Sequence, residues 1–156
     1  MMDKMSTDVF LSQYDGQVAV VIKLFTETRE IEKRMAASED ALAHAAYKLH
    51  NLFNSIEELC KIVAAYFENN IDESERFHKN LLDRMFLEVA GVRPAIFREN
   101  VRTVLSELLR FRHRFRHAYD MKLDIRHIAI LMKDVLSSEK EIVRQLEGFK
   151  TQIRAD

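Results

Sequence analysis

The sequence predicts an all-α protein, because it has few turn-forming residues and repeats its apolar side chains at the helical period. Only three glycines and one proline interrupt the 156 residues, so few of the turns that a sheet protein needs are available. Apolar residues instead recur every three or four positions through most of the chain. A hydrophobic share of 47% and a charged share of 31% are typical of a globular domain. We therefore expect one domain, a bundle of five or six helices.

Two long helices are predicted in the first part of the chain. The first covers about 8–36 in spite of Gly16, and the second covers about 40–68 and ends at Asn69 and Asn70. Their apolar stripes are formed by Phe10, Tyr14, Val18, Val21, Phe25 and Met35, and by Ala45, Leu49, Leu52, Ile56, Leu59, Val63 and Phe67. Both stripes follow the spacing of an amphipathic helix that packs on a core.

A third helix is expected to begin near Asp72. Glu75 follows three residues later, the spacing of a capped helix start, while Gly91 and then Pro94 mark the predicted end. The apolar positions of this helix are Phe77, Leu81, Met85 and Val89.

Three further helices complete the predicted bundle. The fourth covers about 96–117, Asp124 caps a short fifth helix, and Ser138 with Glu141 forms a capping box for the last one. Their inner stripes are Val101, Val104, Leu105, Leu108, Phe111 and Phe115, then Ile125, Ile128, Met132 and Val135, then Ile142, Leu146, Phe149 and Ile153.

Composition excludes several classes of protein. No apolar run approaches the roughly 20 residues of a membrane span, and the start of the chain lacks the plan of a signal peptide, so we expect a cytoplasmic protein without a membrane partner. Cys60 is the only cysteine, which excludes an internal disulfide and a thiolate metal cluster and predicts a buried thiol.

The residues 110–120 carry the strongest functional signal. They hold four arginines, two histidines and a tyrosine, although the formal net charge of the whole chain is only -1. This local density of positive charge predicts a site for an anion. Within it, Arg112, His117 and Tyr119 form the pattern R-x-x-x-x-H-x-Y, which supplies a permanent cation, a group that titrates near neutrality and a phenol.

These groups suit the cleavage of RNA without a metal or a cofactor. A histidine can take the proton of the ribose 2′-hydroxyl, and an arginine fork can neutralise the charge that grows on the phosphate oxygens. On a regular helix, however, Arg112 and His117 point about 140° apart. Either the helix unwinds near Arg116, or the two residues meet across a dimer interface.

Structural explanations compete with this hypothesis. A basic helix end is often a solvated face or a salt-bridge partner of acidic residues, here Glu57, Glu58 and Glu107. Tyr119, Phe111 and Phe115 fit core positions. Among the other histidines, His44 and His127 are expected at the surface and His78 is expected to have no site role. His50 forms a polar stripe with Asn51 and Asn54 that is a candidate lining of the cleft.

Three segments resemble the HepT-like branch of the HEPN superfamily, the ribonuclease toxins paired with minimal nucleotidyltransferase antitoxins. The first runs from Leu108 to Tyr119 and continues with Leu123-Asp124. The others are His50-Asn51-Leu52-Phe53-Asn54, followed by Glu57-Glu58, and the stretch from Glu75 to Leu82. The likeness covers roughly residues 44–153. It implies an N-terminal helical extension at 1–40 and a HEPN domain at 41–156.

The resemblance also implies roles for individual residues. Arg112 and His117 match the catalytic pair, and Tyr119 matches the tyrosine that accepts AMP from the partner nucleotidyltransferase, which silences the toxin. Expected partners are RNA, that antitoxin and a second copy of the chain in a homodimer. The remaining basic side chains of the segment are expected to bind RNA phosphate: Arg110, Arg114, Arg116 and His113.

The sequence leaves open which arginine faces the phosphate and which class of function the protein has. Arg110 also stands in an R-x(6)-H relation to His117, so either Arg110 or Arg112 faces the phosphate. His113 occupies a position where many HEPN nucleases carry a small polar residue, which favours a second hypothesis, a non-catalytic helical module that docks a nucleotidyltransferase or a nucleotide. A third, a purely structural bundle, leaves the arginine cluster unexplained.

Overall fold

A computed structural model describes residues 4–68, 76–117 and 122–155, with the side chain of His117 left out. The helices are α1 (Lys4–Glu32), α2 (Glu39–Glu68), α3 (Phe77–Arg84), α4 (Arg102–His117), α5 (Ile125–Ser137) and α6 (Glu139–Ala155), with a 3-10 turn η1 (Glu99–Val101) before α4. Helices account for all the regular secondary structure of these ranges apart from an isolated bridge between Val89 and Arg93. The prediction of an all-α bundle is confirmed.

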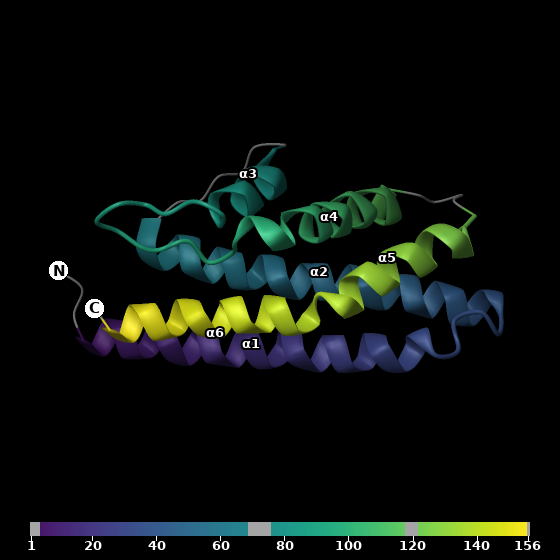
Figure 1. Cartoon of the computed structure of the whole chain (residues 1–156), viewed down its shortest axis with the longest axis horizontal. Coiled ribbons are helices and arrows are strands. Elements are labelled where there is room, and N and C mark those ends of the chain that lie inside the picture. The colour runs from purple at the N-terminus through teal and green to yellow at the C-terminus, as the bar shows by residue number, and fades with distance from the viewer. Residues whose placement is uncertain (1–3, 69–75, 118–121, 156) are drawn as a thin grey trace.

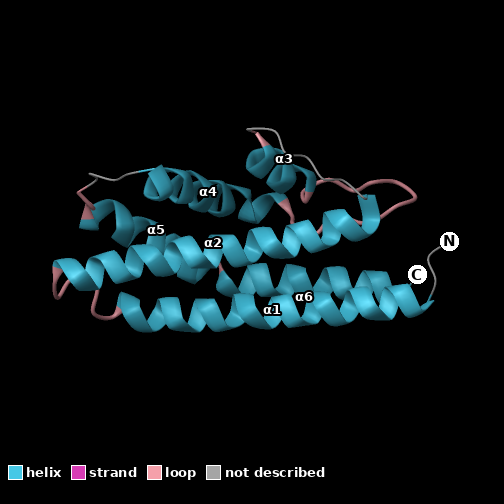
Figure 2. Ribbon diagram, turned by 180° about the vertical axis from the view of Figure 1, so that it is seen from behind, coloured by secondary structure: helices cyan, strands magenta, loops and turns pink. Residues whose placement is uncertain are grey.

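Helix α2 forms the centre of the bundle. It contacts α1, α3, α4 and α5, whereas α6 packs against α1 and α5. Figure 1 shows α1 and α6 on one side of α2, and α3 and α4 on the other. The view from behind shows the same arrangement, with both chain ends at one end of the bundle (Figure 2). Because it lies between the two layers, α2 is the natural platform for side chains that must meet residues of α3 and α4.

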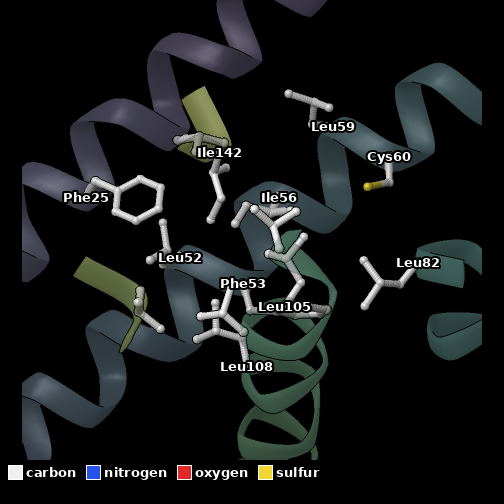
Figure 3. Close-up of a cluster of buried hydrophobic side chains, with 14 of the residues drawn as sticks. Phe25, Leu52, Phe53, Ile56, Leu59, Cys60, Leu82, Leu105, Leu108 and Ile142 are labelled. Atoms are coloured by element: carbon white, nitrogen blue, oxygen red, sulfur yellow. The ribbon is translucent and has the colours of Figure 1, made fainter. Parts of the chain in front are cut away.

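The hydrophobic core is continuous around the middle of α2. Figure 3 shows Leu52, Phe53 and Ile56 of α2 between Phe25 of α1, Ile142 of α6, Leu105 and Leu108 of α4, and Leu82 of α3. All of these side chains are buried, as is the thiol of Cys60, which was the expected fate of that residue. Burial of an apolar side chain of this size contributes about 1.5–3 kcal/mol, so this junction fixes the position of α4 on α2.

Helix α1 is tied to α6 by polar contacts as well as by packing. The Tyr14 hydroxyl donates to the Leu146 carbonyl at 2.8 Å, and Lys150 Nζ lies 2.6 Å from a carboxylate oxygen of Asp15. The helix begins and ends about four residues earlier than the sequence pattern predicted. The proposed domain boundary near residue 40 stays a prediction.

The third helix is shorter than predicted, because the buried side chain of Arg93 donates hydrogen bonds to backbone carbonyls at the end of this helix and after it. Helix α3 ends at Arg84, whereas the pattern predicted a helix up to Gly91. The Arg93 side chain is 0% exposed and donates to the carbonyls of Arg84, Leu87 and Pro94 at 3.0–3.1 Å. A continued helix would need the Arg84 carbonyl for its own hydrogen bond. Gly91 makes the turn with a φ of 74°. The predicted start at Asp72 lies outside the described residues.

The remaining helices have the predicted order. The fourth begins with η1 and becomes α-helical only at Arg102, six residues later than predicted. The Asp124 side chain accepts a hydrogen bond from the Arg126 backbone at 2.9 Å, which confirms its cap. Ser138 differs from the predicted capping box, because its hydroxyl donates back to the Asp134 carbonyl and the Glu141 carboxylate bonds to Asn100, Arg144 and Gln145.

Candidate functional site

One arginine of the basic segment lies inside the protein. Leu108 and Phe111 bury the inner face of α4 against the core, and Arg112, the next residue along, is buried with them. Its side chain is 7% exposed. The other three arginines of the segment, Arg110, Arg114 and Arg116, are exposed. The helix therefore separates one buried cation from a set of cations at the surface.

Residues of α2 hold the Arg112 guanidinium from two directions. Its Nη1 donates to Asn54 Oδ1 and to Glu57 Oε1, both at 3.0 Å. Its Cζ lies 5.2 Å from the centroid of the Phe53 ring, so the cation also has an aromatic face beside it. Its Nε is buried, and no described residue gives it a hydrogen-bond partner. An ion pair at this depth fixes the guanidinium plane, because either charge alone would be expensive to bury.

Glu57 connects three helices. Its carboxylate is 6% exposed, and it accepts from Arg112 of α4 through Oε1 and lies 2.8 Å from Nδ1 of His78 of α3 through Oε2. Lys61, one turn further along α2, approaches to 3.9 Å. The position of the carboxylate between α3 and α4 explains why an acidic residue occurs on the inner face of α2.

His50 extends the network toward the start of α2. Asn54 Nδ2 lies 3.1 Å from His50 Nε2. Because the Asn54 oxygen already accepts from Arg112, its amide nitrogen faces the histidine, and an amide nitrogen can only donate. His50 Nε2 therefore accepts, which makes the imidazole neutral with its proton on Nδ1. That Nδ1 atom is buried and has no hydrogen-bond partner within the described ranges.

The surroundings of His50 favour the same neutral form. Burial lowers the pKa of the imidazole below its ordinary value, and the positive charges of Arg112 and Arg116 lower it further. The folded protein therefore binds a proton at His50 less readily than the unfolded chain does.

We expect His50 to make the folded state sensitive to acid. The stability due to neutral His50 is present above the pKa of the unfolded chain, about 6.5, and is lost as the pH falls below it toward the folded pKa. Wild-type protein should lose more free energy of unfolding between pH 7 and pH 5 than a His50→Gln variant. Denaturant unfolding of both proteins at the two pH values measures the difference, and an equal loss would contradict the assignment.

The other basic side chains of the segment lie on different sides of α4. Arg110 pairs with Glu107, one turn earlier on the same helix. Arg114 lines a groove of about 490 Å³ between α4 and α5, together with Lys122 and His127. His113 is exposed, and the charge of Arg116 acts on His50. The structure thus brings Arg112 and Arg116 to the His50 side and places Arg110 and Arg114 elsewhere. Phosphate binding by these groups stays a prediction.

The structure describes the backbone of the motif histidine but does not describe the motif tyrosine. His117 is the last residue of α4 and only its backbone is described, while Tyr119 lies outside the described residues. Helix α4 extends to His117, so the first of the two alternatives, unwinding near Arg116, does not occur within α4. Five positions at about 100° each leave the Cα atoms of Arg112 and His117 about 140° apart around the axis.

Part of the buried network was predictable from the sequence and part was not. The expected salt bridge of Glu57 with the basic segment is confirmed. His50 and Asn54 contact each other, but the lining of a cleft by their polar stripe stays a prediction. The contact between His78 and Glu57 was missed. A usable signal was the place of Glu57 on the same side of α2 as Phe53 and Cys60, where an unpaired carboxylate would be costly. His44 and His127 are exposed, as expected.

The described part of the chain shows neither a metal site nor a membrane span. Within it, no group of three or more His, Cys, Asp or Glu side chains is arranged to hold a metal ion. The described helices also lack any stretch that is both long enough and apolar enough to cross a membrane.

The comparisons with known proteins identify the family of the chain. A family model described as HepT-like protein matches residues 43–153, which includes α2 to α6 almost completely and omits α1. No curated protein and no solved structure matches the chain. Since the matched region covers well over half of the sequence and carries the whole buried network, the chain belongs to the HepT-like proteins of the HEPN superfamily.

Proposed function

We propose that this protein is the toxin of a toxin–antitoxin pair, a metal-independent endoribonuclease silenced when a partner nucleotidyltransferase adenylylates Tyr119. The observation that carries the proposal is the buried, doubly anchored guanidinium of the motif arginine, Arg112, in a chain of the HepT-like family. The membership makes a toxin of this class the natural expectation. The anchoring supports Arg112, instead of Arg110, as the arginine that meets the phosphate.

The proposed chemistry uses one histidine and one arginine. His117 takes the proton of the ribose 2′-hydroxyl, whose oxygen attacks the phosphorus while the bond to the 5′-oxygen breaks. The leaving oxygen takes up a proton, so the products are a 2′,3′-cyclic phosphate and a 5′-hydroxyl. Arg112 stabilises the negative charge on the phosphate oxygens during this step. Its fixed plane favours this role, because a donor held in place needs no reorganisation when the charge develops.

Two copies of the chain make the proposed site. Within one chain, α4 stays helical through His117, and regular helix geometry leaves the Cα atoms of Arg112 and His117 about 140° apart around the axis. If two copies place their α4 helices against each other, Arg112 of one copy and His117 of the other can face one phosphate. This homodimer is part of the proposal and accounts for the spacing of the motif.

A non-catalytic binding module is the second candidate. The bond between Arg112 and Glu57 favours it, because the carboxylate already compensates the charge of the motif arginine. Such a module would bind a nucleotide or a nucleotidyltransferase through the exposed arginines and would not cleave RNA.

An RNA cleavage assay separates the two candidates. Purified protein is incubated with total tRNA in a metal chelator, and the new ends are analysed for 2′,3′-cyclic phosphate. We expect cleavage by wild type and a loss of about 100-fold or more in Arg112→Lys, which keeps the charge but not the fork. Arg110→Lys is the matched control on the exposed face, and it should keep activity within a few fold. Equal activity of the two variants would remove Arg112 from the mechanism, and an inactive wild type would favour the binding module.

We expect Tyr119→Phe to abolish adenylylation without abolishing the toxin. The phenolic oxygen is the proposed acceptor of AMP, and its removal leaves the partner enzyme nothing to modify at this position. The variant should cleave RNA like wild type and stay toxic when the nucleotidyltransferase is co-expressed. Mass spectrometry after incubation with the partner and ATP measures the added AMP. Modification of Tyr119→Phe at the wild-type stoichiometry would contradict the assignment.

A further inference from the structure

Four aromatic rings of α2 and α4 form a row beside the buried arginine. The ring centroids of Tyr47 and His50 are 6.4 Å apart, those of His50 and Phe115 are 5.4 Å apart, and those of Phe115 and Phe111 are 5.7 Å apart. The row begins in the core, where Phe111 is 6% exposed, and ends at the surface, where Tyr47 is 52% exposed. Phe115 and His50 between them are half-buried.

Tyr47, at the exposed end of the row, has one face of its ring packed on His50. Tyr47 stands one turn before His50 on α2, and the two ring planes are inclined by only 24°. His50 is itself fixed by Asn54 and by its contact with Phe115. An exposed tyrosine that rests on an ordered ring presents a flat face to solvent at little cost in side-chain entropy.

Positive charge borders the same row. The charges of Arg112 and Arg116, one turn apart on α4, both act on the His50 imidazole. Arg116 is exposed, whereas Arg112 lies buried between Phe53, Asn54 and Glu57. A ligand on this surface would therefore meet an aromatic face and the exposed cation of Arg116 side by side, with the buried Arg112 behind them. A nucleotide unit of RNA has the matching parts, a base with a π face and a phosphate next to it.

We propose that Tyr47, supported by His50 and Phe115, stacks on a base of the RNA strand beside the phosphate that Arg112 meets. This inference rests on the proposed function in its choice of RNA as the ligand. It adds a binding subsite on α2. Tyr47 and His50 of this subsite lie outside the R-x-x-x-x-H-x-Y motif, and Phe115 is one of the unspecified positions of the motif. Stacking accepts any base, so the subsite contributes affinity and register on the strand more than sequence specificity.

The test measures RNA binding separately from cleavage. A fluorescent single-stranded RNA with 2′-O-methyl groups cannot be cut by attack of the 2′-oxygen, and its affinity is read by fluorescence anisotropy. Tyr47→Leu keeps an apolar side chain but removes the ring, and we expect it to weaken binding about 5- to 150-fold, the range of one base–aromatic stack. Tyr47→Phe should bind like wild type. Leu87→Ala truncates another exposed apolar side chain, 57% exposed beyond α3, and should also bind like wild type.

The outcomes distinguish this inference from the proposed function. Ring-dependent RNA binding by a protein that cleaves no RNA would support the subsite and reject the nuclease. Cleavage by wild type with equal affinities and equal KM values for Tyr47→Leu and wild type would reject the subsite alone. Light scattering of the same samples supplies a third result: a change of oligomeric state in Tyr47→Leu would mean that the ring packs against a second copy, and it would overturn the inference.

Discussion

Replacement of His117 by alanine is expected to lower RNA cleavage by at least about 100- to 10,000-fold, the usual contribution of general acid–base catalysis. Of the three residue types that define the motif, arginine, histidine and tyrosine, only histidine has an ordinary pKa near neutrality and can both accept and return a proton there. The fold should be unchanged, since His117 is the last residue of α4 and alanine has a high helix propensity. Circular dichroism and the tRNA assay in chelator measure both properties.

His127→Ala is the matched control for this substitution. His127 is also a helical histidine near the groove between α4 and α5, and its side chain is 81% exposed. Its removal should leave cleavage unaltered. If His117→Ala cleaves as fast as His127→Ala, the histidine of the motif has no catalytic role and the proposed mechanism fails.

A mixture of two inactive variants tests whether the site is shared between subunits. In a heterodimer of Arg112→Lys and His117→Ala, one site would combine an intact Arg112 with an intact His117 from the other subunit. Refolding the two variants together should therefore restore part of the cleavage that each lacks alone. If both residues of a site come from one chain, the mixture stays inactive.

Glu57→Ala is expected to destabilise the protein by about 3–5 kcal/mol, the cost of leaving one charge of a buried pair without its partner. The carboxylate is 6% exposed and is the anionic partner of the buried Arg112 guanidinium; Asn54 offers only a neutral oxygen. His78 would lose its partner as well. Urea unfolding of variant and wild type gives the difference in the free energy of unfolding.

Glu58→Ala separates this effect from a general loss of negative charge. Glu58 is the next residue on α2, is 56% exposed and has Lys61 at 4.0 Å. Its substitution should change the free energy of unfolding by no more than about 0.5 kcal/mol, as is usual for exposed sites. If the two variants are equally stable, the pair of Glu57 and Arg112 does not hold α4 on α2 in the way described.

The helices of this protein could be predicted from the sequence where local patterns decide them. The apolar stripe of α2 and the Asp124 cap of α5 depend only on residues within a few positions, and both are observed where predicted. The end of α3 depends on Arg93, nine residues away, whose partners are carbonyls that become available only when the chain leaves the helix. No local pattern contains that competition.

The candidate site shows the same division. The spacing of His50, Asn54 and Glu57 places them on one face of α2, which periodicity can predict. That Arg112 reaches this face is a consequence of how α4 packs on α2, and the sequence left Arg110 and Arg112 equally possible. Phe111 occupies the core position expected for it, whereas Phe115 is only half-buried and takes part in the aromatic row.

The pairing of Arg112 with Glu57 also separates two electrostatic roles within the basic segment, long-range attraction of RNA and contact with one phosphate. A buried guanidinium paired with a carboxylate contributes little to the electric field outside the protein, and so it contributes little to the long-range attraction of RNA. Attraction of a polyanion, and the loss of that attraction as salt is added, then falls to the exposed cations, Arg114 and Arg116 above all. Ionic strength should therefore govern how fast RNA arrives at the protein, while the orientation of Arg112 at the phosphate stays the same in dilute and in concentrated salt.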